Sequence, residues 1–261
     1  MKITRFTRCF LFMSLLTVLT PIVLFAPQAY AETYVGGQFG LSMPSIGKGL
    51  SNGELTSRNV AFPTGTVTFP EGTTIDNQSL ASSLLVGIKL GHFFSRAPWL
   101  GIETELFQTT PHIKQQDITI RSDSPVTFTP AGGGPPTLIN TPLTSPGFQG
   151  ANFRVITWAP LNFVFRYPGT RLQPYVAIGP GVFFGRIKDG SITQGPDSQS
   201  STKIGLNTQV GLQYYITRHV SMFGEWKYNY TRFNFQENDN FFGFKSTYSM
   251  HLFAVGVSYH F

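Results

Sequence analysis

Large apolar residues alternate one by one with small or polar residues along eight stretches of the chain. In the last stretch every second residue from Phe253 to Phe261 is large and apolar, whereas those between them, such as Gly256 and Ser258, are small or polar. A period of two is typical of a β-strand whose two faces meet different surroundings. The stretches cover residues 33–43, 83–94, 99–108, 152–167, 172–187, 203–216, 220–233 and 250–261. Each is at least as long as the ~9–11 residues of a tilted strand that crosses a bilayer.

The connections between these stretches alternate in length. Three are short and have the sequences SRAP, PGTR and TRH. The others are long and cover residues 44–82, 109–151, 188–202 and 234–246. This alternation is typical of an up-and-down barrel in an outer membrane, whose short turns face the periplasm and whose long loops face outside. We therefore predict an all-β fold, an eight-stranded antiparallel up-and-down transmembrane β-barrel with four long extracellular loops.

Some segments fit this pattern less well, because proline cannot donate a hydrogen bond to a β-ladder. We expect Pro160 to break the fourth strand and Gly179-Pro180-Gly181 to form a bulge or bend in the fifth. Two further strand-like pieces, residues 67–69 and 117–122, lie in the first two long loops. Their flanks are polar and rich in proline, so we interpret them as hairpin ends that project above the membrane.

The start of the chain has the layout of a secretory signal peptide. Three basic residues precede a mostly apolar run at 10–25, and Ala29-Tyr30-Ala31 follows. Such a segment is removed by cleavage after the last small residue, here Ala31. The alternative is a helix that stays in the membrane, but the run is shorter than the ~20 residues of a span and contains Pro21. We assign residues 1–31 to a cleaved signal peptide and residues 32–261 to one outer-membrane barrel domain.

Cleavage changes the chemistry of the chain. Three of the 19 Lys and Arg residues would leave, so 16 basic residues would face 13 acidic ones and the net charge would fall from +6 to +3. This small excess does not suggest nucleic acid as a partner. Cys9, the single cysteine, would also leave, so the mature chain could form neither a disulfide nor a cysteine metal site. Charged residues make up only 12% and aromatic residues 15% of the chain, which fits large apolar groups that face lipid.

Charged residues of both signs share the inward parity of the predicted strands. They are Lys89, Glu103, Glu105, Arg154, Arg166, Lys203, Glu225 and Lys227. An eight-stranded barrel is just wide enough for side chains to fill it. We therefore expect a salt-bridge network that plugs the interior. The alternative is a gated polar channel, whereas an open diffusion porin needs about 16 strands.

Aromatic residues lie near the ends of the predicted strands. They are Tyr34, Phe94, Trp99, Tyr167, Tyr214, Tyr215, Tyr259 and Phe261. In membrane barrels such residues form girdles at the two interfaces, and we expect that role here. The alternative is ordinary sheet packing, since aromatic side chains favour strands in general.

Three segments resemble the small outer-membrane β-barrel superfamily of the OmpA/OmpX and opacity-protein type. They are LNFVFRYPGTRLQPYVAIGPGVFFGRI (161–187), HVSMFGEWKY (219–228) and the terminal YHF. The resemblance implies a barrel in the outer membrane whose final aromatic residues, Tyr259 and Phe261, are recognised by the barrel-assembly machinery. It implies little about activity, because folds of this kind host many functions. The long first and second loops distinguish this chain from the smallest members.

One short motif is a candidate for catalysis. Some small outer-membrane barrels are lipid A deacylases with a His-x-Ser pair and a nearby carboxylate, which His219, Ser221 and Glu225 resemble. However, His219 lies at a predicted periplasmic turn and the parity directs Ser221 and Glu225 into the barrel, whereas that family acts on lipid from the outer face. The five histidines are scattered along the chain and indicate no metal site. We predict that the protein is not an enzyme and needs no cofactor or metal.

The predicted location determines the partners that we expect. A monomer in a Gram-negative-type outer membrane would contact outer-membrane lipid and lipopolysaccharide. Surface loops on a rigid scaffold are where binding usually resides. We therefore expect a structural or adhesive role, with a host or environmental ligand at the long loops. The alternative is a narrow channel for small or hydrophobic solutes, as in OmpW-like barrels.

Overall fold

The computed structural model describes residues 32–44, 49–56, 58–76, 78–148, 150–188, 198–237 and 243–261. The predicted signal peptide lies outside these ranges, so its presence and its cleavage after Ala31 stay predictions. No helix within the described ranges is long and apolar enough to cross a membrane.

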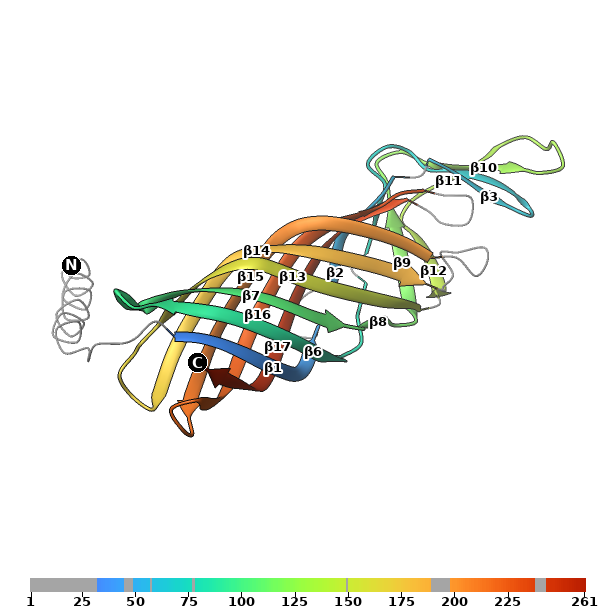
Figure 1. Cartoon of the computed structure of the whole chain (residues 1–261). Helices are drawn as coiled ribbons and strands as arrows, with labels where there is room; N and C mark the ends of the chain where they lie inside the picture. Colours follow the sequence, from blue (N-terminus) through green and yellow to red (C-terminus); the bar gives the residue numbers. More distant parts are fainter. Residues whose placement is uncertain are drawn as a thin grey trace, which may run out of the picture.

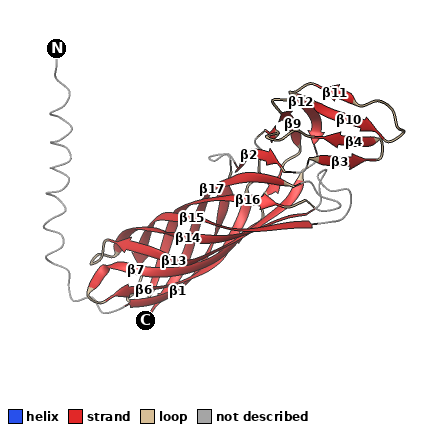
Figure 2. Cartoon of the chain, turned by 90° about the horizontal axis from the view of Figure 1, so that it is seen from above, coloured by secondary structure: helices blue, strands red, loops and turns tan. Residues whose placement is uncertain are grey.

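Eight long strands form a closed ring, and Figures 1 and 2 show the side of this barrel in two views at right angles. They are β1 (Glu32–Met43), β6 (Ser83–Phe94), β7 (Ala97–Thr109), β13 (Ala151–Arg166), β14 (Leu172–Lys188), β15 (Ser198–Tyr215), β16 (Val220–Phe235) and β17 (Phe244–His260). Each strand pairs antiparallel with the next in this order. The ladder between β1 and β17, from Tyr34–His260 to Met43–His251, closes the ring. The predicted eight-stranded antiparallel fold is confirmed.

The predicted strand ends agree with the structure to within a few residues, except at two loop-side ends. β15 begins at Ser198 and β17 at Phe244, several residues before the predicted 203 and 250. The added segments, SQSST and FKSTYS, have polar residues on their outward face and therefore lack the alternation that marks a lipid-facing strand. The strands continue beyond the apolar band, where the outer face meets water.

The two faces of the barrel wall differ as the alternation predicts. The exposed fraction of Leu84, Val86 and Ile88 on the outside of β6 is 61–70%, whereas Lys89 between Ile88 and Leu90 is 3% exposed. In a soluble protein such outward apolar side chains would be costly, but in a membrane barrel they contact hydrocarbon. The same holds for the last strand, whose outward apolar set runs from Phe253 to Phe261.

A β-bulge in β13 reverses the parity of that strand. The pairing with β14 passes from Trp158–Val182 to Phe163–Ile178, so β13 has one more residue than its partner there. Leu161, Phe163 and Phe165 face outward as predicted, but above the bulge the inward residues are Val155 and Thr157. Arg154 therefore points outward, and its predicted place in the interior is wrong.

The bulge lies at Pro160, where a break was expected, and not at Gly179-Pro180-Gly181. The latter segment keeps an unbroken register with β15, from Gly179–Asn207 to Gly181–Gly205. Gly179 instead accommodates the bulge of β13, because a Cβ at this position would lie 2.1 Å from the carbonyl oxygen of Leu161. The expected bulge or bend in β14 is corrected to a bulge in the neighbouring strand.

The first two loops build extracellular β-structure together. β2 (Gly49–Leu55), β5 (Thr74–Ile75), β9 (Gln116–Arg121) and β12 (Leu143–Phe148) extend the sheet from the upper end of β17. β3 (Asn59–Phe62), β4 (Gly65–Thr68), β10 (Val126–Pro130) and β11 (Thr137–Ile139) form a separate four-stranded sheet in the order β11-β10-β4-β3. β8 (His112–Ile113) pairs with β13. Residues 67–69 and 117–122 project above the barrel as expected (Figure 2). β4 forms a hairpin with β3, and the two loops also pair with each other through β4 and β10 and through β5 and β9.

Candidate functional site

A cluster of five charged side chains crosses the middle of the barrel interior. Lys89 on β6, Glu103 and Glu105 on β7, and Glu225 and Lys227 on β16 are each at most 5% exposed. The Nζ atom of Lys89 lies 3.4 Å from Oε2 of Glu103 and also contacts the carboxylate of Glu225. The Nζ atom of Lys227 lies 2.8 Å from Oε1 of Glu105 and 2.7 Å from Oε2 of Glu225. Glu225 thus joins both lysines into one network.

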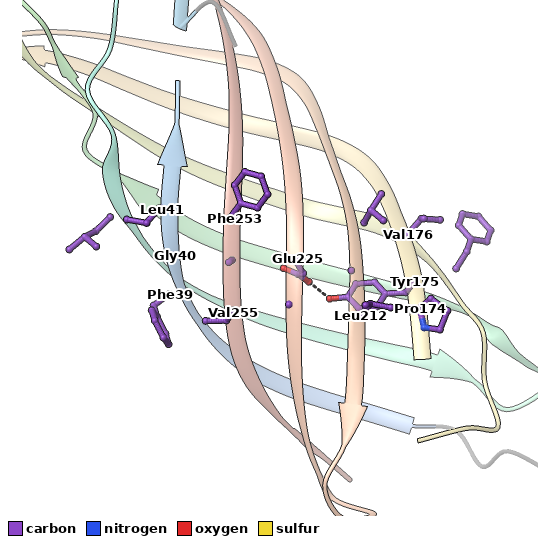
Figure 3. Close-up of a pocket in the computed structure, with 16 residues that line it drawn as sticks. Phe39, Gly40, Leu41, Pro174, Tyr175, Val176, Leu212, Glu225, Phe253 and Val255 are labelled. Atoms are coloured by element: carbon purple, nitrogen blue, oxygen red, sulfur yellow. Dashed lines mark hydrogen bonds between the residues drawn. The ribbon is translucent and has the colours of Figure 1, made fainter. Parts of the chain in front are cut away.

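Two tyrosines complete the cluster from the periplasmic side. The hydroxyl of Tyr34 donates a hydrogen bond to Glu103 over 2.6 Å, and the hydroxyl of Tyr175 donates one to Glu225 (Figure 3). Tyr34 is 5% exposed, so its predicted place in an interfacial girdle is wrong. Its parity is that of the inward residues of β1, and its hydroxyl supplies a donor that a buried carboxylate requires.

Two glutamines connect the charges across the barrel. Gln209 donates to Glu103 over 2.6 Å and accepts from Lys227 over 2.6 Å, while Gln38 donates to Glu105 over 3.1 Å. Buried ion pairs offset their desolvation only when their remaining donors and acceptors are also satisfied. These amides therefore stabilise a charge arrangement that carries three carboxylates and two ammonium groups.

A second polar cluster closes the periplasmic end of the interior. Arg166 of β13 pairs with Glu32 of β1, with 2.6 Å between Nη2 and Oε2, and its guanidinium lies 3.5 Å from the ring centre of Phe93. The hydroxyl of Tyr215 donates to Glu32 over 2.5 Å. Arg166 is inward as predicted but belongs to this separate cluster. Tyr215 also points inward, which corrects its predicted place in the girdle.

Ser221, His260 and Glu32 lie in the order of a hydrolytic triad. Oγ of Ser221 is 2.8 Å from Nε2 of His260, and Nδ1 of His260 is 2.5 Å from Oε1 of Glu32. The histidine in the sequence motif, His219, instead places Nδ1 3.0 Å from the backbone oxygen of His260. The motif residues His219, Ser221 and Glu225 are therefore not assembled with one another. The alternation shows only that His260 and Ser221 face inward, whereas their contact depends on the register between β16 and β17.

The serine and the histidine of this triad are buried in the wall of the interior. Ser221 is fully buried and His260 is 2% exposed, and the amide nitrogen of Gln213 donates to Oγ of Ser221 over 2.7 Å. The cavity between the two polar clusters, which Gln213 and Ser258 help to line, has a volume of about 10 Å³. That volume accommodates roughly one water molecule. The serine is held as a hydrogen-bonding partner inside the barrel.

Lys203 is the remaining predicted site residue. It has inward parity on β15 and is half-buried, but no carboxylate of a described residue lies within ion-pair distance of it. Its cross-strand partner is Phe183, which belongs to an apolar part of the interior. The predicted set thus divides into the central cluster, the periplasmic Arg166, the isolated Lys203 and the outward Arg154.

The extracellular half of the interior is apolar. The cluster that fills it includes Leu85, Phe107, Phe153, Val155, Phe183, Ile187, Phe233, Phe235, Phe244, Tyr248, Met250 and Leu252. The ring of Phe153 lies with its centre 5.9 Å from that of Phe233 and 6.0 Å from that of Tyr248. We call this set the apolar plug. The plug is not apparent from the sequence, because Phe153, Phe233 and Phe235 alternate with polar outward residues and so invert the usual pattern of a membrane strand.

The wall beside the apolar plug has a seam between β15 and β16. Their ladder runs from Tyr215–Ser221 to Leu206–Tyr230 and ends there, although both strands continue. Beyond it, single side chains span the gap: Oγ1 of Thr231 donates to the backbone oxygen of Ile204 over 3.2 Å, and Oγ of Ser201 accepts from the amide of Asn234 over 3.1 Å. The seam is therefore weaker than the paired part of the same junction.

The outer wall carries a shallow apolar depression of about 980 Å³. Figure 3 shows Phe39, Leu212, Phe253 and Val255 around it, on strands from both sides of β16. At its centre the outward position of β16 is Gly224, where an added Cβ would meet nothing within 4 Å. The depression lies on the apolar outer face, and its lining also includes the inward Tyr175 and Glu225 of the central cluster.

The sequence matches a family model described as outer membrane protein beta-barrel domain over residues 15–261. The chain belongs to this family. No curated protein matches the sequence.

Solved structures with similar architecture are outer-membrane proteins of low sequence identity. OprG from Pseudomonas aeruginosa is 12% identical, with a TM-score of 0.52, over 88% of this chain and 96% of that one. Neisserial surface protein A is 11% identical with a TM-score of 0.46, over 88% of this chain and 99% of that one. Ail of Yersinia pestis, solved with the heparin analogue sucrose octasulfate, is 13% identical with a TM-score of 0.41, over 89% of this chain and 100% of that one. At such identities the likeness to OprG supports the fold alone.

This outer-membrane barrel places several of the predicted girdle residues on its outer face. Trp99, Tyr167, Tyr214, Tyr259 and Phe261 are 39–69% exposed and lie near the periplasmic ends of their strands. Aromatic side chains at this level fit a membrane interface. Tyr259 and Phe261 also contact each other, with 5.1 Å between ring centres. Their recognition by the barrel-assembly machinery stays a prediction.

Proposed function

We propose that this protein is a closed, non-enzymatic outer-membrane barrel that binds external partners through the β-sheet built by its first two loops. The observation that carries the proposal is the combination of a filled interior with ordered extracellular structure. Both polar clusters and the apolar plug occupy successive levels of the interior. A barrel of this width supports surface binding better than diffusion.

The extracellular sheet has features of a binding surface. Among the described strands, β11 lies at one edge of this sheet and pairs only with β10, and an extended partner segment can add to such an edge. Leu138 on β11 is 67% exposed, so an apolar side chain is available along this edge. A small core of Val60, Phe69 and Val126 holds the sheet together. It is therefore a folded platform on which a ligand could be recognised.

Removal of this sheet tests the proposal. A variant in which residues 59–68 and 126–139 are each replaced by a short Gly-Ser linker keeps the barrel strands intact. Cells that display the variant should lose adherence to immobilised matrix proteins, glycans or host cells that the unmodified protein confers. Heat-modifiable gel migration serves as the control for a folded barrel. Undiminished adherence with a folded barrel would contradict the proposal.

A second candidate function is passage of small hydrophobic solutes, which the seam favours. The seam lies beside the apolar plug, and its outward residues change from Ile204, which is 76% exposed, to the polar Thr202. It therefore begins near the boundary between lipid and water. Rearrangement of the phenylalanines could let an apolar solute enter from outside and leave sideways into the outer leaflet.

Cross-linking distinguishes this candidate from the first. Continuation of the ladder register places residue 202 opposite residue 234, so Thr202→Cys with Asn234→Cys would bridge the seam. Leu212→Cys with Gly224→Cys bridges the paired part of the same junction and is the control. Lateral passage predicts that oxidation of the first pair alone blocks uptake of the apolar dye N-phenylnaphthylamine and that reduction restores it. Equal uptake in both states would exclude the seam as a route.

A further inference from the structure

The outer face of β13, β14 and β15 changes from apolar to basic within a few residues. Successive cross-strand rows are formed by Trp158, Val182 and Ile204, then by Ile156, Phe184 and Thr202, then by Arg154, Arg186 and Ser200. The exposed fraction is 45% for Trp158, 40% for Phe184 and 76% for Ile204, so the lower rows face lipid. The row of Arg154 lies at the end of the strands that leads into the long loops. It therefore marks the external boundary of the apolar band.

Arg154 and Arg186 are directly opposite each other across the ladder, and both are exposed. Residues in this relation have Cβ atoms about 4.5–5.5 Å apart, and like charges there destabilise a sheet. No carboxylate of a described residue lies within ion-pair distance of either guanidinium. Within the described part of the chain, Nη2 of Arg186 contacts Oγ of Ser198 at 2.9 Å. The two arginines thus lack a counter-anion from the described part of the chain.

We propose that Arg154 and Arg186 bind a phosphate group of lipopolysaccharide in the outer leaflet. Guanidinium groups bind phosphate through paired, charge-assisted hydrogen bonds, and two of them side by side match one dianionic group. An anionic headgroup at this level would place its acyl chains along Trp158, Phe184 and Ile204 below. A free anion would use the charges but not this apolar wall. The surroundings therefore favour an acylated, phosphorylated ligand.

Binding of purified lipid A to the full protein, extracted from outer membranes in detergent, tests the site. Native mass spectrometry would measure the dissociation constants of phosphorylated lipid A and of the same lipid after removal of its phosphates. The variant Arg154→Gln with Arg186→Gln removes both charges. Arg171→Gln with Arg218→Gln removes two exposed charges at the periplasmic turns and is the matched control. Heat-modifiable migration establishes that each variant is folded.

We expect the Arg154/Arg186 variant to bind phosphorylated lipid A roughly tenfold or more weakly, because charge-assisted hydrogen bonds are lost. The control variant should bind like the unmodified protein, and the dephosphorylated lipid should bind weakly to all three. Equal affinity of the two variants would overturn the proposal. Displacement of the lipid by inorganic phosphate at comparable concentration would also overturn it, since the site would then be one for simple anions.

Discussion

Glu225 has the most connected position in the barrel interior. Its carboxylate contacts both buried lysines and accepts a hydrogen bond from Tyr175. Removal of one partner from a buried ion pair leaves an uncompensated charge, which costs more than the pair itself contributes. The stability of the central cluster should therefore depend on this residue more than on any pairing at the surface.

Replacement of Glu225 by Gln keeps the side-chain shape but removes the charge shared by Lys89 and Lys227. We expect the free energy of unfolding to fall by about 3–5 kcal/mol. Urea unfolding of the barrel refolded in lipid vesicles would measure it. Glu71→Gln is the control, because the side chain of Glu71 is 86% exposed beside Arg58 and should change stability by less than about 1 kcal/mol. Similar midpoints for the two variants would contradict a stabilising role for the cluster.

Ser221 provides a test of the absence of catalysis. The hydrogen bonds of this buried serine to His260 and Gln213 make it a structural partner, so Ser221→Ala should lower the free energy of unfolding by about 1–3 kcal/mol. The acylation pattern of lipid A from cells that express the variant should equal that of cells with the unmodified protein, as read by mass spectrometry. A change in acylation that depends on Ser221 would show that the triad reaches a substrate and would refute the non-enzymatic proposal.

At the scale of elements, β13 shows how one inserted residue redirects side chains. Below the bulge the strand follows the predicted parity, and above it Arg154 faces outward. Gly179 on β14 makes room for the bulge, since its Cβ position would lie 2.1 Å from the oxygen of Leu161. The bulge therefore depends on a glycine in the neighbouring strand.

A methyl group at Gly179 should disrupt this junction. Gly179→Ala is expected to lower the free energy of unfolding by about 1–3 kcal/mol, as overpacking does elsewhere. Gly224→Ala is the matched control, because an added Cβ at this outward glycine would meet nothing within 4 Å. Urea titration in vesicles would compare the two. Equal stability would mean that the wall adapts to the bulge without this glycine.

Sequence alternation predicts the strands well because each lies between two different media along most of its length. It predicts less where that contrast disappears. The polar start of β15 meets water on its outer face, and the pattern does not extend to it. Pro160 marks the break in β13 in the sequence. The outward direction of Arg154, however, follows only from the pairing register of β13 with β14 and with β7. The partners of Ser221 were missed for the same reason, because contacts across the interior depend on ring closure.

At the scale of the whole molecule, closure and filling of the ring act together. β1 and β17 remove the open edges that lipid would not tolerate, and the extracellular strand β2 continues pairing along β17 where β1 ends. The narrow ring then brings charges from β6, β7 and β16 within ion-pair distance. Such contacts fix the shape that carries the extracellular sheet.

Single-channel recording tests whether the whole interior is closed. The refolded protein in a planar bilayer should give no discrete conductance steps, because an ion would have to displace the clusters of Glu225 and Arg166 and then the apolar plug. Glu225→Gln combined with Lys227→Met, which loosens the central cluster, should also stay silent, since the apolar plug still excludes hydrated ions. Heat-modifiable migration would establish that both proteins are folded. Reproducible steps from the unmodified protein would instead mean that the interior opens, and would favour a channel over a binding scaffold.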